Sequence, residues 1–160
     1  MVLRVLRSVV LFVLLAGGML SIAVGGASAA GWVAPDSASL AVNDLDFDEQ
    51  GNAIAVGVGA DLGGDPMIRA TTRPFGGQWS ASVAVSGDDD SDASDPRVAV
   101  DPQGNAVAAW SAFDEAAGRR VVRVSSRPAG GAWSEPITIS PGTVSASDHD
   151  VAIDGQGNAT

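Results

Sequence analysis

The aspartates of the stretch SGDDDSD have the spacing that best suits a metal ion in this sequence. Asp88, Asp90 and Asp92 have the first three spacings of an EF-hand loop, and calcium prefers carboxylate oxygens. The glycine expected next is Ala93, and the terminal glutamate is absent, so a solvated acidic linker is the simpler interpretation. Calcium at these three aspartates is the one cofactor hypothesis that the sequence supports.

A second acidic series also has D-x-D-x-D spacing, in NDLDFDEQG. Asp44, Asp46 and Asp48 alternate there with Leu45 and Phe47. This alternation is typical of a strand whose apolar side chains face inward and whose acidic side chains face outward. We therefore expect a strand rather than a metal site, with only Asp48 belonging to the turn that follows.

Residues suited to glycoside hydrolysis are sparse. That reaction needs two carboxyl groups at a set separation or, in sialidases, a tyrosine nucleophile with a carboxylate and arginines. The sequence has no tyrosine, and Glu49 and Glu115 fall in expected turns or loops. Arg119, Arg123 and Arg127 share the parity of one strand face, which we interpret as a solvent face that balances the acidic charge. We predict no catalytic residues and no hydrolytic activity for these 160 residues.

Composition limits the classes of partner. The chain has 19 acidic and 9 basic side chains and a net charge of −10, which would repel phosphate backbones, so we expect no nucleic-acid partner. There is no cysteine for a disulfide. A single histidine, His149, excludes a metal site with several histidines from this chain.

The N-terminus has the pattern of a secretory signal peptide. MVLRVLR is basic, an apolar run follows it, and Ala27-Ser28-Ala29 forms an A-x-A cleavage site. We predict a signal peptide over 1–29, a linker over 30–41 and a secreted protein without membrane association after cleavage. An uncleaved membrane anchor is the alternative, because the apolar run is nearly long enough to span a bilayer.

The rest of the chain repeats itself. The tetrapeptide QGNA occurs three times, and its glycines, Gly51, Gly104 and Gly157, are 53 residues apart. The motif RPxGGxWS occurs twice, beginning at Arg73 and at Arg127. Self-similarity at a fixed period indicates a repeat architecture. The predicted units span residues 42–94, 95–147 and 148–160, the last of them incomplete.

The pattern within a unit is that of β-strands. RVAVD and VAID alternate with period two, and no segment after the signal peptide has a helical apolar stripe. The strands expected in the second unit lie at about 97–101, 105–113, 119–126 and 136–140. Asp101-Pro102-Gln103-Gly104 is typical of a type I turn whose glycine adopts the left-handed conformation and closes a hairpin. QGNA is therefore predicted to be a structural turn.

Four-stranded units of about 50 residues in tandem are typical of β-propeller blades. The units D-x-Q-G-N-A and R-P-x-G-G-x-W-S resemble those of secreted bacterial β-propellers with sialidase-like, BNR-type repeats, over almost everything after residue 40. The predicted fold class is all-β, with tandem four-stranded blades of 53 residues that follow a signal peptide helix. Trp79 and Trp133 are expected to begin the outer strand of their blades.

The resemblance speaks to the fold more than to an activity. It implies a secreted, non-catalytic propeller module that binds an extracellular carbohydrate or protein. The alternative is the N-terminal part of a sialidase-like glycoside hydrolase whose catalytic residues lie beyond residue 160. Because propellers close with at least about four blades, we expect a longer propeller, and we expect two blades alone to associate through exposed apolar faces.

We predict that the mature chain begins at Ala30 or Gly31, immediately after the A-x-A site. N-terminal sequencing of secreted protein checks this expectation. Recovery of a chain that still begins with Met1 from the membrane fraction would contradict it and favour the anchor.

Overall fold

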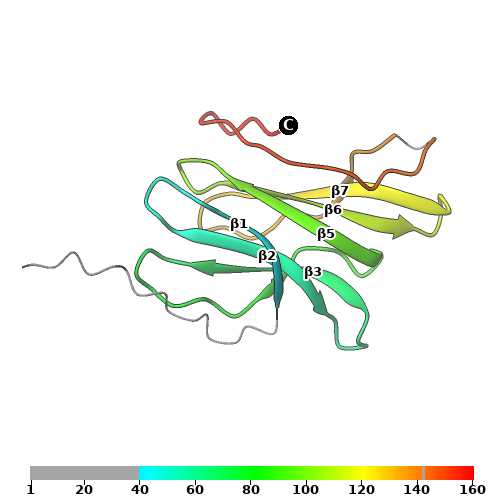
Figure 1. Ribbon diagram of the computed structural model, residues 1–160, viewed down its shortest axis with the longest axis horizontal. Helices are drawn as coiled ribbons and strands as arrows, with labels where there is room; N and C mark the ends of the chain where they lie inside the picture. The colour runs from blue at the N-terminus through cyan, green and yellow to red at the C-terminus, as the bar shows by residue number, and fades with distance from the viewer. Residues whose placement is uncertain (1–39, 142) are drawn as a thin grey trace, which may run out of the picture. The chain divides into compact units, whose positions relative to one another are not determined.

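The computed structural model describes residues 40–141 and 143–160, which form two four-stranded antiparallel sheets (Figure 1). The first sheet contains, in spatial order, β1 (Ala41–Phe47), β2 (Ala53–Ala60), β3 (Pro66–Arg73) and β4 (Val83–Ala84). The second contains β5 (Ser91–Val100), β6 (Ala106–Asp114), β7 (Arg119–Arg127) and β8 (Ile137–Thr138) in the same order. The all-β prediction is confirmed for these residues. The predicted signal peptide helix and almost all of the linker lie outside them.

The strands of the second unit lie close to their predicted positions, with two differences. β5 begins at Ser91 rather than near residue 97, and its pairing with β6 shifts register twice. Asp92 and Asp95 have positive φ angles of 51° and 53° there, so the irregular start hides the period-two pattern of a strand. β8 has only two residues, and Trp133 lies before it, so the expectation that the tryptophan begins the outer strand is wrong.

The apolar core lies between the two sheets. Ile54, Val56 and Ile68 of the first sheet belong to one buried cluster with Val98 and Trp110 of the second. The Trp110 side chain is fully buried, and Trp133 packs against the edge of the same cluster. Strand alternation therefore assigns the larger apolar residues of β2 and β5 to the contact between the sheets.

Strand β1 differs from the expected orientation. Leu45 and Phe47 are 43% and 55% exposed, whereas Asp44 and Asp46 are half-buried. The prediction that the apolar residues of this strand face the core and the aspartates face solvent is therefore wrong. The physical reason is that the described residues provide no sheet for Leu45 and Phe47 to pack against, although the equivalent valines of β5 pack against the first sheet.

The aspartates of β1 join the two sheets. Asp44 Oδ2 accepts a hydrogen bond from the backbone amide of Val98 (3.0 Å), and Asp46 Oδ2 accepts one from the amide of Val100 (2.8 Å). These bonds satisfy amides on the side of β5 that does not pair with β6. The first two aspartates of the D-x-D-x-D series thus bind the backbone of the next unit.

The recurring turn has the predicted hairpin geometry. The Gly104 amide donates to the Asp101 carbonyl (3.0 Å), and Gly104 has a φ of 90°, in the left-handed region that favours glycine. Asp101 Oδ1 accepts hydrogen bonds from the amides of Gln103 (2.9 Å) and Asn105 (2.8 Å). The other two copies of the turn also have glycine in this conformation, at Gly51 and Gly157.

The asparagine of QGNA joins two hairpins of the same sheet. Asn105 Nδ2 donates to Asp101 Oδ2 (2.7 Å), while Asn105 Oδ1 accepts a hydrogen bond from the Ala129 amide in the β7–β8 connection (3.0 Å). Asn52 makes the same two bonds in the first sheet, with Asp48 and Phe75. Burial alone would raise the pKa of Asp101, but the hydrogen bonds from Asn105 and the turn amides outweigh it and lower that pKa.

The motif RPxGGxWS also has a structural explanation. Arg127 Nε donates to the Gly131 carbonyl (2.8 Å), and Ser134 Oγ accepts a hydrogen bond from the Ser126 amide (3.1 Å). The first sheet has the equivalent bonds, from Arg73 Nε to the Gly77 carbonyl and from the Thr72 amide to Ser80 Oγ. The motif therefore closes the connection between the third and fourth strands of each sheet.

We predict that Asn105→Ala lowers the free energy of unfolding by about 2 kcal/mol, because it leaves Asp101 Oδ2 and the Ala129 amide without their side-chain partner. Asn158→Ala is the matched control, since Asn158 is exposed and hydrogen-bonds only to Asp154 within the described residues. Its expected loss is no more than about 1 kcal/mol. Urea denaturation followed by tryptophan fluorescence measures both losses, and equal losses would contradict the role assigned to Asn105.

Candidate functional site

The described residues present candidate sites at two opposite ends of the sheets (Figure 1). One end, called the turn end, carries the QGNA turns at 48–52 and 101–105 and the hairpins at 74–77 and 128–131. The other, called the loop end, carries the β2–β3 and β6–β7 loops and the connection 85–90 between the sheets. Recurring residues build the turn end, whereas the loops differ between the two units.

Asp90, the central residue of the predicted calcium site, lies at the loop end and is buried. Its Oδ2 accepts hydrogen bonds from the Gly87 amide (3.0 Å) and from Trp110 Nε1 (3.2 Å). Its Oδ1 lies 2.7 Å from Arg123 Nη1, in an ion pair whose aspartate side chain is 0% exposed. The interpretation of this segment as a solvated acidic linker is therefore wrong at Asp90, which anchors the segment to the second sheet.

The other two predicted calcium ligands border a shallow acidic hollow. Asp88 and Asp92 line a cavity of about 160 Å³ together with Asp90, Asp61 and Asp65. The described residues contain no group of three or more histidine, cysteine, aspartate or glutamate side chains that is arranged for a metal ion. Calcium binding stays a prediction, which a calcium-dependent rise in melting temperature that Asp88→Asn abolishes would support.

Burial raises the pKa of Asp90, and the nearby charge of Asp89 raises it further. The hydrogen bonds from Gly87 and Trp110 and the charge of Arg123 oppose this shift only in part. The folded protein therefore holds a proton on Asp90 more tightly than the unfolded chain does. Ionisation of this carboxyl thus costs stability as the pH rises through the acidic range just above the ordinary aspartate pKa.

The predicted solvent face of Arg119, Arg123 and Arg127 is wrong, because all three residues are half-buried and alternate on β7 with the buried Val121 and Ser125. The Arg123 side chain is only 11% exposed and pairs with Asp90 and, at 3.2 Å, with Asp89. Arg120 Nη2 donates to the Asp92 carbonyl (3.0 Å) and to Ser94 Oγ (2.6 Å). These arginines fasten the start of β5 and the connection before it to the second sheet.

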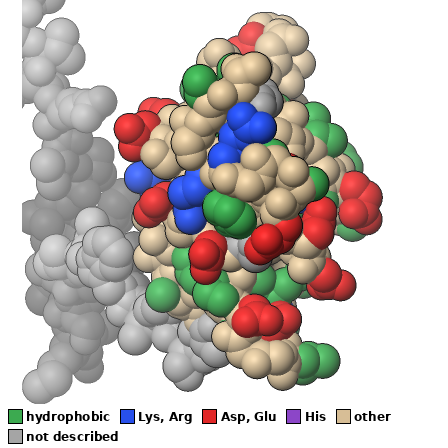
Figure 2. All heavy atoms as spheres, turned by 90° about the vertical axis from the view of Figure 1, so that its right-hand side faces the viewer, with side chains coloured by type: hydrophobic (Ala, Val, Ile, Leu, Met, Phe, Trp, Pro, Cys, Tyr) green, Lys and Arg blue, Asp and Glu red, His purple; other side chains and the backbone are tan. Residues whose placement is uncertain are grey.

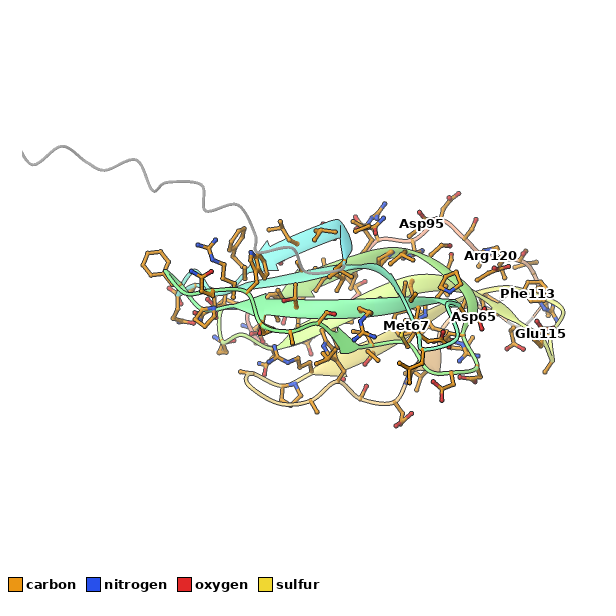
Figure 3. All side chains as sticks on the ribbon, turned by 90° about the horizontal axis from the view of Figure 1, so that it is seen from below. Asp65, Met67, Asp95, Phe113, Glu115 and Arg120 are labelled. Atoms are coloured by element: carbon orange, nitrogen blue, oxygen red, sulfur yellow. The ribbon has the colours of Figure 1, made fainter. Side chains whose placement is uncertain are left out.

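The surface of the loop end shows the same arrangement. Figure 2 shows basic side chains in a run across this end, with acidic side chains on both sides of the run. Figure 3 shows Arg120, Phe113 and Glu115 near the β6–β7 loop, at the same end of the sheets as Asp65 and Met67 of the first sheet. Charges of both signs therefore lie next to one another at the loop end, with the aspartates of the acidic hollow beside the arginines.

A cleft of about 350 Å³ lies between the two sheets at the turn end. Its polar lining comes from both units: Asp48, Gln50, Asn52, Thr72 and Arg73 of the first, and Gln103 and Arg127 of the second. Its apolar lining is Ala53, Ile54, Pro74, Val100 and Ala129. Two turns and two hairpins from consecutive units thus converge on one cleft, with Gln50 and Gln103 exposed at it.

The charge in this cleft is not neutralised by local partners. Arg73 and Arg127 use Nε to bind backbone carbonyls, and neither guanidinium pairs with a carboxylate anywhere in the described part of the chain. Asp48 is the one carboxylate of the lining, and both of its oxygens accept hydrogen bonds from Asn52 (2.8 and 2.7 Å). The cleft is therefore a cationic site on a protein with a net charge of −10.

Sequence reasoning did not identify the cleft, although it identified the motifs that build it. The QGNA turn and the arginine of RPxGG recur together in the first two units, and their nearly equal spacing was a signal that they share one end of each sheet. The spacing did not indicate that Gln50 and Arg73 of one unit line the same cleft as Gln103 of the next unit.

We predict that Asp90→Ala lowers the free energy of unfolding at neutral pH by about 3 kcal/mol, because it leaves the Gly87 amide, Trp110 Nε1 and the largely buried Arg123 without the carboxyl that they contact. Asp89→Ala is the matched control, because Asp89 pairs with the same arginine but its side chain is 76% exposed. Its expected loss is no more than about 1 kcal/mol. Urea denaturation measures both variants, and a control as destabilised as Asp90→Ala would refute the assignment.

No helix that could cross a bilayer occurs among residues 40–141 and 143–160. In comparisons with known proteins, no protein-family model, no curated protein and no solved structure matches this chain.

Proposed function

We propose that the two sheets are consecutive blades of a β-propeller, in a secreted, non-catalytic repeat module that binds extracellular carbohydrate or protein. The two units have the same strand order, and they make equivalent hydrogen bonds in their turns and hairpins. They pack face to face through one apolar core. Four-stranded antiparallel units that repeat and pack in this way are the building blocks of propellers.

The observation that carries the binding role is the cleft between the sheets. Its volume of about 350 Å³ lies within the usual range of pockets for small ligands. Amides of Gln50 and Gln103 supply both donors and acceptors, and Arg73 and Arg127 supply donors, beside apolar residues that include the buried Ile54 and Val100. Such a lining suits a ligand rich in hydroxyl groups.

The chemistry of the cleft favours binding over hydrolysis. Glycoside hydrolysis usually requires two carboxyl groups at a set separation across the substrate. Asp48 is the one carboxylate that lines the cleft, and it is engaged in holding its own turn. Glu115 is exposed at the opposite end of the sheets. The residues that meet a ligand in the cleft are therefore hydrogen-bonding residues and cations.

The proposal predicts that the full chain binds at least one soluble polysaccharide or glycoprotein in isothermal titration calorimetry. Gln50→Ala with Gln103→Ala should weaken this binding at least about tenfold, because it removes two amides that reach the ligand. Gln156→Ala is the matched control, since the equivalent Gln156 does not line the cleft, and it should bind as the natural chain does. Turnover of chromogenic glycosides that Glu115→Gln abolishes would overturn the proposal.

A further inference from the structure

We infer that the cleft selects an acidic polysaccharide, a polymer whose sugar units carry carboxylates, and that Arg73 and Arg127 bind those carboxylates. The inference rests on the proposed function, because it names the ligand class of the same cleft. Two observations support it. The two guanidinium groups are fixed in orientation but have donors that are unpaired in the described part of the chain, and the cleft continues into a second hollow between the sheets.

Both arginines are held in place and still offer donors. Arg73 Nε donates to the Gly77 carbonyl (2.9 Å) and Arg127 Nε to the Gly131 carbonyl (2.8 Å), so each side chain is fixed at its own hairpin. The Nη atoms of both residues make no hydrogen bond or ion pair within the described residues. A guanidinium whose orientation is fixed in advance loses little entropy when it binds a carboxylate, and its fork geometry matches the two oxygens.

The cleft continues into a second hollow. A cavity of about 420 Å³ is lined by Thr72, Ser80 and Val83 of the first sheet and by Arg127 and Trp133 of the second. Thr72 and Arg127 line both cavities, so the two form one groove with Arg127 between them. Trp133 adds a half-buried aromatic surface, which suits the apolar face of a sugar ring. A groove of this extent accommodates several linked units rather than one small anion.

The acidity of the protein determines how such a ligand is recognised. A net charge of −10 repels a polyanion at long range, but salt at about 0.1 M screens charges beyond roughly 10 Å. Recognition therefore depends on contacts at short range, where the cleft has two cations and one carboxylate. The carboxylate, on Asp48, faces Asn52 donors rather than a ligand.

Titration calorimetry of the full chain with polygalacturonate tests the inference, with the fully methyl-esterified polymer as the neutral ligand of the same shape. The uronate polymer should bind at least about tenfold more tightly than its ester. Arg73→Gln and Arg127→Gln should each weaken uronate binding about tenfold, as expected when a charge-assisted hydrogen bond is lost. Arg97→Gln is the control with the same charge change, because Arg97 lies outside the groove, and it should leave binding unchanged.

A second pair of variants avoids any effect of the arginines on folding. Gln50→Glu and Gln103→Glu each add a carboxylate at an exposed position of the cleft, and Gln156→Glu adds one in the third unit. The first two should weaken uronate binding at least about tenfold more than they weaken binding of the ester, because the added carboxylate repels only the charged polymer, whereas the control should change neither. Equal binding of acid and ester would overturn this inference and leave the proposed function intact. Binding of neither polymer, with a neutral glycan or a protein bound instead, would also overturn it.

Discussion

The contact between aspartate and asparagine in each turn is the interaction on which the rest of the structure depends. Asp101 is 1% exposed, and its carboxylate is satisfied only because Asn105 and the turn amides donate to it. The same asparagine fixes the neighbouring hairpin through Ala129. One amide side chain therefore positions both segments that a sheet contributes to the turn end. The turns of the two sheets also approach each other. A Cβ atom at Gly104 would lie 3.3 Å from Asp48 Oδ2, so the second turn lies close to the aspartate of the first.

The two units share this frame but differ in how they meet their neighbours. The first unit presents Asp44 and Asp46 to the backbone of β5, whereas the equivalent residues of the second unit are Arg97 and Ala99. The buried Trp110 is likewise specific to the second unit. Its equivalent in the first unit is Gly57, where even a Cβ atom would collide with the backbone of Ala41. The two units therefore share their turns and hairpins but make different contacts with a neighbouring sheet, because they differ at a few of the residues that lie at this contact.

This difference explains how far the sequence predicts the structure. Alternation and turn chemistry are local, so the strands of the second unit and the left-handed Gly104 were predictable. The burial of Asp90 was not, because it depends on Arg123, which is 33 residues away in sequence and comes close only when β7 is paired. The cleft was missed for the same reason. Its lining joins residues from two units, and no local pattern encodes which side chains meet across a sheet contact.

A cleft built from scaffold residues also constrains what it binds. Arg127 closes its own hairpin with Nε and faces the groove with its remaining donors, so one residue serves both the fold and the cleft. The third unit brings Gly157 close to Asp101, the same relation as between Gly104 and Asp48, so the frame of the turn end recurs at the next contact. The lining that includes both Arg73 and Arg127 occurs, among the described residues, at the contact between the first and second units. The turn geometry therefore follows from the repeat, whereas the charge of the cleft depends on which residues the two facing units bring together.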